Sequence, residues 1–395
     1  MHSIARAALR SRLGEWPSFD ESDIEVVASV LRSGKVNYWT GDEGREFERE
    51  YAAYVGTKHA VAVANGSVAL ELALRALGIG EGDEVVTTCR SFIASASCAV
   101  MVGAVPLFAD VDRLTQNITA QTIRKKITSR TRAIIAVHLA GCPCDMDPIL
   151  TVAKEHGIKV VEDCAQAHGA RYKGRAVGSI GDVGAFSFCQ DKIITTGGEG
   201  GIITLNDDAQ WNLAWSFKDH GKSYDADYRY QHAPSPRGQH GSFGTNWRLT
   251  EMQSALGRNG LRRLDRWVER RRENADVLRT AFAGIPVVRM PEVPANCYHA
   301  YYRFYAFVEP GCMKPGWTRD RIIQEIADAG VPCSDGGCGE IYLERAFGWG
   351  DRPRLLVAQE LAETSLMFMV HPTLTLNDMD LIATTSSHIL RLASR

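Results

Sequence analysis

The chain lacks the features that mark membrane, secreted and nucleic-acid-binding proteins. No stretch approaches the roughly 20 uninterrupted apolar residues that span a bilayer, and no apolar segment typical of a signal peptide follows the N-terminal run Met1–Arg6. Lysine and arginine number 45 against 47 aspartates and glutamates, a net charge of −2, whereas nucleic-acid binders usually carry a strongly basic face. We therefore expect a cytoplasmic protein without membrane or nucleic-acid partners.

Metal-binding and nucleotide-binding signatures are also missing. The ten cysteines include only one close pair, Cys142 and Cys144, and no second pair at zinc-finger spacing, so we expect buried free thiols and no metal site. The run Gly221–Ser223 resembles the end of a P-loop, but Ser216 stands where the first glycine of that motif must be. The glycines of Gly197–Gly201 precede a strand pattern rather than a helix, which excludes a dinucleotide fingerprint.

What the chain does contain is an alternation of strand and helix patterns. Short apolar runs bounded by turn residues predict strands at His59–Ala64, Glu84–Thr88, Val105–Ala109, Arg132–Val137, Lys159–Glu162, Gly184–Phe188 and Gly201–Thr204. Helical patterns separate most of the earlier strands, so we predict an α/β fold with a mainly parallel sheet covered by helices. Such sheets bind ligands at the carboxyl ends of their strands.

The length and composition predict two domains. At 395 residues and 45% hydrophobic content, the chain can bury a large core. We place the boundary near Leu264, which gives an N-terminal segment and large domain over 1–263 and a smaller α+β domain over 264–395. The smaller domain is expected to contain a strand at Tyr302–Val308 and helices near Thr318–Ala329 and Asn377–Leu392. The polar segment Lys218–Arg248 is predicted to be a long loop outside the core, with a role in function or in contact with a partner.

Lys192 is the most informative single residue. It follows the apolar strand pattern Gly184–Phe188 and precedes a glycine-rich turn, so its amine can lose solvent and act as a nucleophile toward an aldehyde. Asp163 ends a second apolar strand, where a buried carboxylate needs a charged partner. A lysine that forms a Schiff base and an aspartate under a pyridinium nitrogen are the groups a protein contributes to pyridoxal phosphate.

Other residues at strand ends fit the same cofactor, although each has an ordinary alternative. Asn65-Gly66-Ser67 ends a strand and opens a helix, which suits a phosphate but equally suits a simple helix cap. Phe92 has a flat face for a pyridine ring, but an aromatic at this place is more often part of the core. Gln166 could also be a hydrogen-bonded surface residue.

Taken together, these motifs resemble those of the DegT/StrS-type sugar aminotransferases, which are fold-type I pyridoxal phosphate enzymes with an aspartate-aminotransferase-like fold. The resemblance runs from about Gly34 to about Gly257 and continues more weakly to the C-terminus. It implies that Lys192 and Asp163 are catalytic. It also implies that Gly66, Ser67 and Ser187 bind the cofactor phosphate, that Phe92 stacks on its ring and that Gln166 lies near the ring face and 3-oxygen.

The run Thr245-Asn246-Trp247-Arg248 resembles an asparagine-aromatic-arginine motif of that family. There the asparagine reaches the cofactor phosphate of the neighbouring subunit, so the resemblance implies a homodimer with shared active sites and assigns that role to Asn246. For the sugar pocket it suggests Tyr38, Trp39 and Thr40, with His299 and His371 as further candidates. Ala140 stands where an aromatic residue is common, which indicates a pocket of different shape.

The resemblance implies an aminotransferase that moves an amino group from an amino acid, expected to be glutamate, to a keto sugar, expected to be nucleotide-linked. Pyridoxal 5'-phosphate would be the cofactor and pyridoxamine phosphate its intermediate form, and the product would enter amino-sugar or polysaccharide biosynthesis. A sugar dehydratase on the same scaffold is the closest alternative, but those relatives carry histidine in place of Lys192. A non-catalytic regulator would be expected to lose the cofactor residues, which are all present here.

Overall fold

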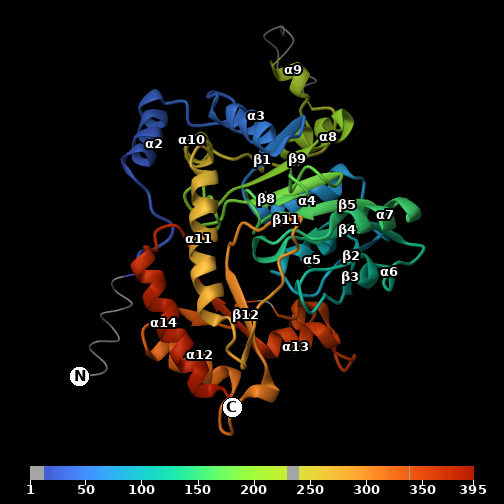
Figure 1. Cartoon of the computed structure of the whole chain (residues 1–395). Coiled ribbons are helices and arrows are strands. Elements are labelled where there is room, and N and C mark those ends of the chain that lie inside the picture. The colour runs from blue at the N-terminus through green and yellow to red at the C-terminus, as the bar shows by residue number, and fades with distance from the viewer. Residues whose placement is uncertain (1–12, 229–239, 338) are drawn as a thin grey trace.

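The computed structural model describes residues 13–228, 240–337 and 339–395 (Figure 1). The N-terminal run Met1–Arg6, whose sequence suggested the absence of a signal peptide, lies outside the described residues. Within the described part of the chain, no helix is both long and apolar enough to cross a membrane.

A seven-stranded sheet forms the centre of the larger body, with the strand order β1-β9-β8-β5-β4-β2-β3. The strands are β1 His59–Val63, β2 Glu84–Thr88, β3 Val105–Ala109, β4 Thr131–Val137, β5 Lys159–Asp163, β8 Val183–Ser187 and β9 Gly201–Leu205. The run from β8 to β3 is parallel, whereas β9 pairs antiparallel with both β1 and β8. The predicted α/β fold with a mainly parallel sheet is therefore confirmed.

Helices cover both faces of this sheet (Figure 1). They are α3 Glu43–Val55, α4 Gly66–Ala76, α5 Ala94–Met101, α6 Ala120–Arg124, α7 Met146–His156, α8 Asp208–Lys218 and α10 Glu251–Leu261, together with the peripheral α2 Glu21–Ser33 and α9 Tyr224–Tyr228. Successive strand residues enter opposite layers: Val161 packs in the cluster that contains α4, and Val160 packs in the cluster that contains α7. This two-residue period, with apolar side chains on both sides, explains why the strands read as continuous apolar runs.

A smaller antiparallel sheet lies at the other end of the molecule, in the order β10-β12-β14-β13. Its strands are β10 Val288–Arg289, β12 Phe304–Val308, β13 Cys333–Ser334 and β14 Ser365–Phe368, and the helices of this part are α12 Arg319–Asp328, α13 Leu356–Thr364 and α14 Leu376–Ala393. The strand and both helices expected in this part are present, with ends within two residues of prediction. Three short strands, β6 Arg171–Tyr172, β7 Arg175–Ala176 and β11 Cys297–Tyr298, form a third sheet.

The long helix α11, Leu264–Phe282, connects the two cores. Leu264 and Val268 at its start pack with the large-sheet cluster, while Leu278 and Phe282 at its end pack with the small-sheet cluster. A domain boundary near Leu264 therefore stays a prediction, because one continuous helix contributes to both cores. Short 3-10 helices lie at Leu139–Gly141, Pro310–Cys312, Ile341–Leu343 and Arg345–Phe347.

The carboxyl ends of the parallel strands meet along one edge of the large sheet. Asp163 ends β5 and lies in register with Val137 of β4 and Ala185 of β8. Ser187 ends β8 and pairs with Gly201, which also pairs with Val63 at the end of β1. The first turn of α4 therefore begins beside Ser187, and the predicted cofactor residues share one edge.

Candidate active site

Lys192 lies in the loop between β8 and β9, and its side chain is 16% exposed. The backbone around it is held on both sides: its N–H donates to the Cys189 carbonyl at 3.0 Å, and its carbonyl accepts from the Trp16 indole at 2.8 Å. Its Nζ lies 3.8 Å from a carboxylate oxygen of Asp191 and 3.5 Å from the hydroxyl of Tyr302. The amine is thus partly screened from solvent and positioned by polar neighbours.

Asp163 is a buried carboxylate at the end of β5, with 3% exposure. Burial raises the pKa of its carboxyl group, although hydrogen bonds from Ser95 and Ala165 and the charge of Lys192 act in the opposite direction. The Ser95 hydroxyl donates at 2.6 Å and the Ala165 N–H at 3.1 Å. Among the residues that the structure describes, none forms an ion pair with Asp163, so a cationic ring nitrogen would supply the missing partner.

The start of α4 and the end of β8 form a suitable phosphate site. Asn65 caps the helix by accepting from the Val68 N–H at 3.0 Å, which leaves the first amides of the helix directed outward. A Cβ added at Gly66 would lie 2.5 Å from the Cβ of Ser187, so only glycine allows these two segments to approach so closely. The Ser187 hydroxyl is therefore fixed next to the positive end of the helix, and Ser67 is exposed beside it.

Phe92 and Gln166 are the remaining predicted cofactor residues, and they follow strands β2 and β5 in the chain. Phe92 precedes α5 and is 58% exposed, so its ring is accessible to a ligand. Its carbonyl accepts from the N–H of Ser95, the residue that bonds Asp163. The Gln166 side chain accepts from the Ala140 N–H at 2.8 Å. Both residues thus connect to the segment around Asp163.

The residues predicted for the shared phosphate contact and the sugar pocket are less closely grouped. Asn246 is exposed, and its side chain accepts from the Arg248 N–H at 3.4 Å. Trp39 and Thr40 are also exposed, and the Trp39 indole donates to Asp219 at 3.0 Å. No bond described in the structure connects these side chains to Lys192 within the same chain.

Two of the predicted substrate residues, Tyr38 and His299, are buried in the structure. Tyr38 is 1% exposed, and its hydroxyl donates to Glu48 at 2.8 Å, so it is a core residue. His299 is buried against the ring of Tyr301 at 3.7 Å between centroids, and burial lowers its pKa to about 3. Both side chains have partners inside the chain, and their contact with a substrate stays a prediction.

His371, the remaining histidine candidate, is also buried, and it shares a hydrogen bond of 2.8 Å with Thr373. Burial lowers its pKa to about 3, and the charges of Arg271 and Arg303 act in the same direction. His371 therefore lies near Arg271 and Arg303, which bond the Tyr302 carbonyl and Asp191, but contact with a substrate stays a prediction.

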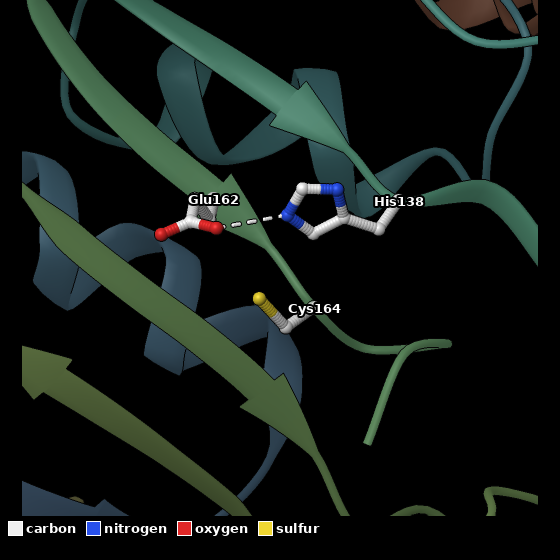
Figure 2. Close-up of side chains that lie close together, drawn as sticks. All are labelled: His138, Glu162 and Cys164. Atoms are coloured by element: carbon white, nitrogen blue, oxygen red, sulfur yellow. Dashed lines mark hydrogen bonds and ion pairs between the residues drawn. The ribbon is translucent and has the colours of Figure 1, made fainter. Parts of the chain in front are cut away.

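A buried cluster next to Asp163 contains residue types that can bind a metal, but two of its members already have hydrogen-bond partners. His138, Glu162 and Cys164 bring ligand-type atoms within 4.8 Å of one another (Figure 2). The Glu162 carboxylate already accepts from His138 at 3.0 Å and from backbone N–H groups of Gly178, Ile180 and Gly181. The Cys144 N–H donates to the other ring nitrogen of His138, so the polar atoms of His138 and Glu162 already have hydrogen-bond partners beside β5.

The sequence motifs did not indicate several polar residues that the structure places around Lys192 and Asp163. Ser95 belongs to α5, Tyr302 and Arg303 directly precede β12, and Asp191 is the immediate neighbour of the lysine. A hollow of about 710 Å³ lies elsewhere, at the end of β3 and the start of α13, and none of the predicted cofactor residues line it. The candidate site is instead an open edge that presents Phe92.

The fold and this arrangement of lysine, buried aspartate and helix N-terminus define an aspartate-aminotransferase-like enzyme of fold type I. The DegT/DnrJ/EryC1/StrS aminotransferase family matches residues 17–386. The chain therefore belongs to this family, as its motifs predicted.

Similar proteins agree with this assignment. The spore coat polysaccharide biosynthesis protein SpsC of Bacillus subtilis is 40% identical over 79% of this chain and 79% of its own length. The GDP-perosamine synthase of Caulobacter vibrioides is 36% identical over 95% of this chain and 97% of its own. The X-ray structure of an aminotransferase from Psychrobacter cryohalolentis superposes with a TM-score of 0.94, at 50% identity and with coverage of 96% and 99%.

Solved relatives also include the putative sugar aminotransferase Spr1654 of Streptococcus pneumoniae in its PLP form. That structure has a TM-score of 0.84 and 27% identity and covers 95% of this chain and 97% of its own.

Proposed function

We propose that this protein is a pyridoxal 5'-phosphate-dependent aminotransferase that moves an amino group from glutamate to a nucleotide-linked keto sugar. The observation that carries the proposal is the pairing of a partly screened amine, Lys192, with a buried carboxylate, Asp163, that has no ion-pair partner among the described residues. When bound, the cofactor supplies an electron-accepting ring conjugated to the nitrogen that is transferred. The residues of the chain supply binding, orientation and proton transfer.

Three groups of residues would hold the cofactor. The amides of Gly66 and Ser67 and the hydroxyl of Ser187 bind its phosphate, because they meet at the positive end of α4. Asp163 binds the ring nitrogen and keeps it protonated. Phe92 covers a ring face that water would otherwise reach.

The proton transfers belong to Lys192. With its amine free, Nζ would accept the proton that the amino donor loses and later return it, acting as the general base and acid of the transfer. The same amine reverses these transfers when the keto sugar is the acceptor. Asp163 is held by Ser95 in a fixed orientation throughout, so the charge it supplies requires no reorganisation during the reaction.

The substrate assignment rests on the relatives. GDP-perosamine synthase carries a nucleotide in its name, and SpsC is named for polysaccharide biosynthesis. We therefore propose a nucleotide-linked keto sugar as acceptor, a role in amino-sugar or polysaccharide biosynthesis, and an enzyme that works in the cytoplasm. A panel of nucleotide keto sugars, each incubated with glutamate or glutamine and analysed by mass spectrometry, tests this assignment. Absence of an aminated product from every member would overturn it.

An absorbance spectrum separates this function from its two alternatives. A lysine-linked cofactor gives a yellow band that glutamate should bleach. A dehydratase would bind pyridoxamine phosphate without that linkage, and a non-catalytic regulator would bind no cofactor. Borohydride should also attach the cofactor irreversibly to Lys192 and to no other lysine.

The exposure of Asn246 supports a homodimer with shared sites, in which this side chain serves the neighbouring subunit. Lys192→Ala and Asn246→Ala homodimers should then both be impaired. In a reassembled equal mixture, about half of the dimers are mixed, and each of these contains one site with both wild-type residues, so activity should recover to roughly a quarter of wild type. Activity no higher than the parental average would mean that Asn246 acts within its own chain.

A further inference from the structure

The amine of Lys192 lies beside a group of polar residues, Asp191, Tyr302 and Arg303, none of which is among the residues expected to hold the cofactor. Nζ lies 3.5 Å from the Tyr302 hydroxyl and 4.8 Å from the centroid of its ring. It lies 3.8 Å from one oxygen of Asp191. The lysine thus meets a hydroxyl, an aromatic face and a carboxylate at one place.

The two oxygens of Asp191 are divided between different partners. One accepts from the Tyr302 hydroxyl and, at 2.8 Å, from Arg303, and the other faces Lys192. Burial alone would raise the pKa of Asp191, but the charge of Lys192, the Tyr302 hydrogen bond and the charge of Arg303 bring it below its usual value. Asp191 is therefore ionised at neutral pH and orients the hydroxyl.

Because the Tyr302 hydroxyl donates its single hydrogen to Asp191, only its lone pairs remain for Lys192. Burial raises the pKa of Tyr302 far above neutral pH, and Asp191 raises it further, so the hydroxyl stays neutral. The lysine must then be the donor in the contact between them. This arrangement orients the amine toward the Tyr302 hydroxyl.

The backbone of Tyr302 is anchored from two directions. Its N–H donates to the Ala140 carbonyl at 2.8 Å, and its carbonyl accepts from Arg271 at 3.2 Å. Arg271 lies on α11, while Ala140 follows β4. The hydroxyl therefore has a fixed position relative to the lysine, set by parts of both cores.

We propose that Tyr302, oriented by Asp191, is a positioning residue that holds the Lys192 amine while it is not bonded to the cofactor. Lysine has a flexible four-carbon side chain, so an unheld amine would sample many positions between its two proton transfers. A fixed resting contact with Tyr302 limits that motion. This role rests on the function proposed above, since it requires a lysine that is released during turnover.

The contact can be measured on the cofactor-free, full-length protein. Formaldehyde with cyanoborohydride methylates neutral, accessible amines, and peptide mass spectrometry reports the rate at Lys192, with the exposed Lys154 as internal reference. In Tyr302→Phe and in Asp191→Asn, methylation of Lys192 should be about three- to tenfold faster, the change expected when one ordinary hydrogen bond is lost.

Tyr54→Phe is the matched control, because its hydroxyl also donates to an aspartate, Asp265 at 2.6 Å, between α3 and α11. Its Lys192 rate should equal that of the native protein. An unchanged rate in both Tyr302→Phe and Asp191→Asn, or an equal increase in Tyr54→Phe, would overturn the proposal.

The loaded enzyme provides a second readout. Tyr302→Phe should lower kcat about tenfold, as expected when one positioned contact is lost, with the KM for the amino donor and the borohydride tag on Lys192 unchanged. A change confined to KM or to cofactor content would instead show a substrate-binding or structural role. If borohydride fails to tag Lys192 in the native protein, the proposed function fails, while the methylation rates still report whether Tyr302 holds the lysine.

Discussion

Replacing Asp163 with asparagine separates the chemistry of this site from its stability. The two side chains have the same shape, and the surrounding bonds can adapt. The amide group of the introduced asparagine can donate to Ser95, whose hydroxyl can donate in turn to Ser91, 2.7 Å away, while the Ala165 N–H keeps its acceptor. We therefore expect the Asp163→Asn variant to fold and to bind the cofactor.

Turnover of this variant should fall by about tenfold to a thousandfold. An opposite charge within contact distance shifts a pKa by about 1–3 units, and each unit lost at the ring nitrogen reduces its protonated fraction about tenfold at a pH above its pKa. Asp163 is 3% exposed, so little water screens its charge. The upper part of the range is therefore the better expectation.

Although Asp163→Asn lowers turnover, it should not lower the stability of the cofactor-free protein. Because burial raises the pKa of Asp163, its stabilising contribution is present below the ordinary carboxyl pKa and is lost as the pH rises through the raised value. At neutral pH the ionised carboxylate opposes folding, and asparagine removes that charge. Thermal unfolding at pH 7 should show a Tm for the variant no lower than that of the native protein.

Glu162→Gln is the control, since Glu162 is an adjacent buried carboxylate whose pKa is lowered, whereas that of Asp163 is raised. Burial would raise its pKa, but bonds from His138 and from the backbone of Gly178 and Gly181 bring it below the usual value. Its stabilising contribution is therefore present above the ordinary carboxyl pKa and is lost as the pH falls. Glutamine should lower the unfolding free energy by about 1–3 kcal/mol with turnover per folded site retained. Near-native turnover of Asp163→Asn, measured with cofactor content equalised, would refute the role of Asp163.

Further predictions concern the lysine and the phosphate site. Lys192→Ala should still bind the cofactor, because the phosphate residues and Asp163 remain, yet show no turnover and no borohydride tag; a tag on another lysine would show that the site is misassigned. Gly66→Ala should weaken cofactor binding about ten- to a hundredfold, since its Cβ would lie 2.5 Å from that of Ser187 and overpacking of this kind costs about 1–3 kcal/mol. Gly80→Ala, whose Cβ would meet only the Val102 carbonyl at 3.8 Å, should bind cofactor normally, and equal affinities in a fluorescence titration of the two variants would contradict the close-approach argument.

The strands and the cofactor motifs could be predicted from the sequence because their signals are local. Each strand of the large sheet is a short apolar run, and the predicted ends agree with the structure within one residue, as for Glu84–Thr88 and Val105–Ala109. Residues such as Asp163 and Ser187 directly follow or end these runs. Parallel strands bring such positions to one edge, so the grouping of cofactor residues followed from the fold class.

The burial of the candidate substrate residues could not be predicted in this way. Tyr38 adjoins the exposed Trp39 in sequence, yet its ring is in the core because Glu48 and Trp215 provide partners for its hydroxyl. Nothing in the local pattern distinguishes the two aromatics. The burial of Tyr38 depends on its contacts with helices α3 and α8, which come from other parts of the chain.

The sequence by itself therefore determined the fold class and the family, and it singled out the lysine, aspartate and glycine proposed to hold the cofactor, because each signal is encoded in a few consecutive residues and their strand. Only the tertiary structure decided the environment of the reacting amine. Tyr302 and Arg303 reach Asp191 across more than a hundred residues, and Asp163 and Glu162, adjacent in sequence, have pKa shifts of opposite direction. The physical reason is that hydrogen bonds, burial and charge act through space, and their partners are chosen by packing rather than by neighbouring residues.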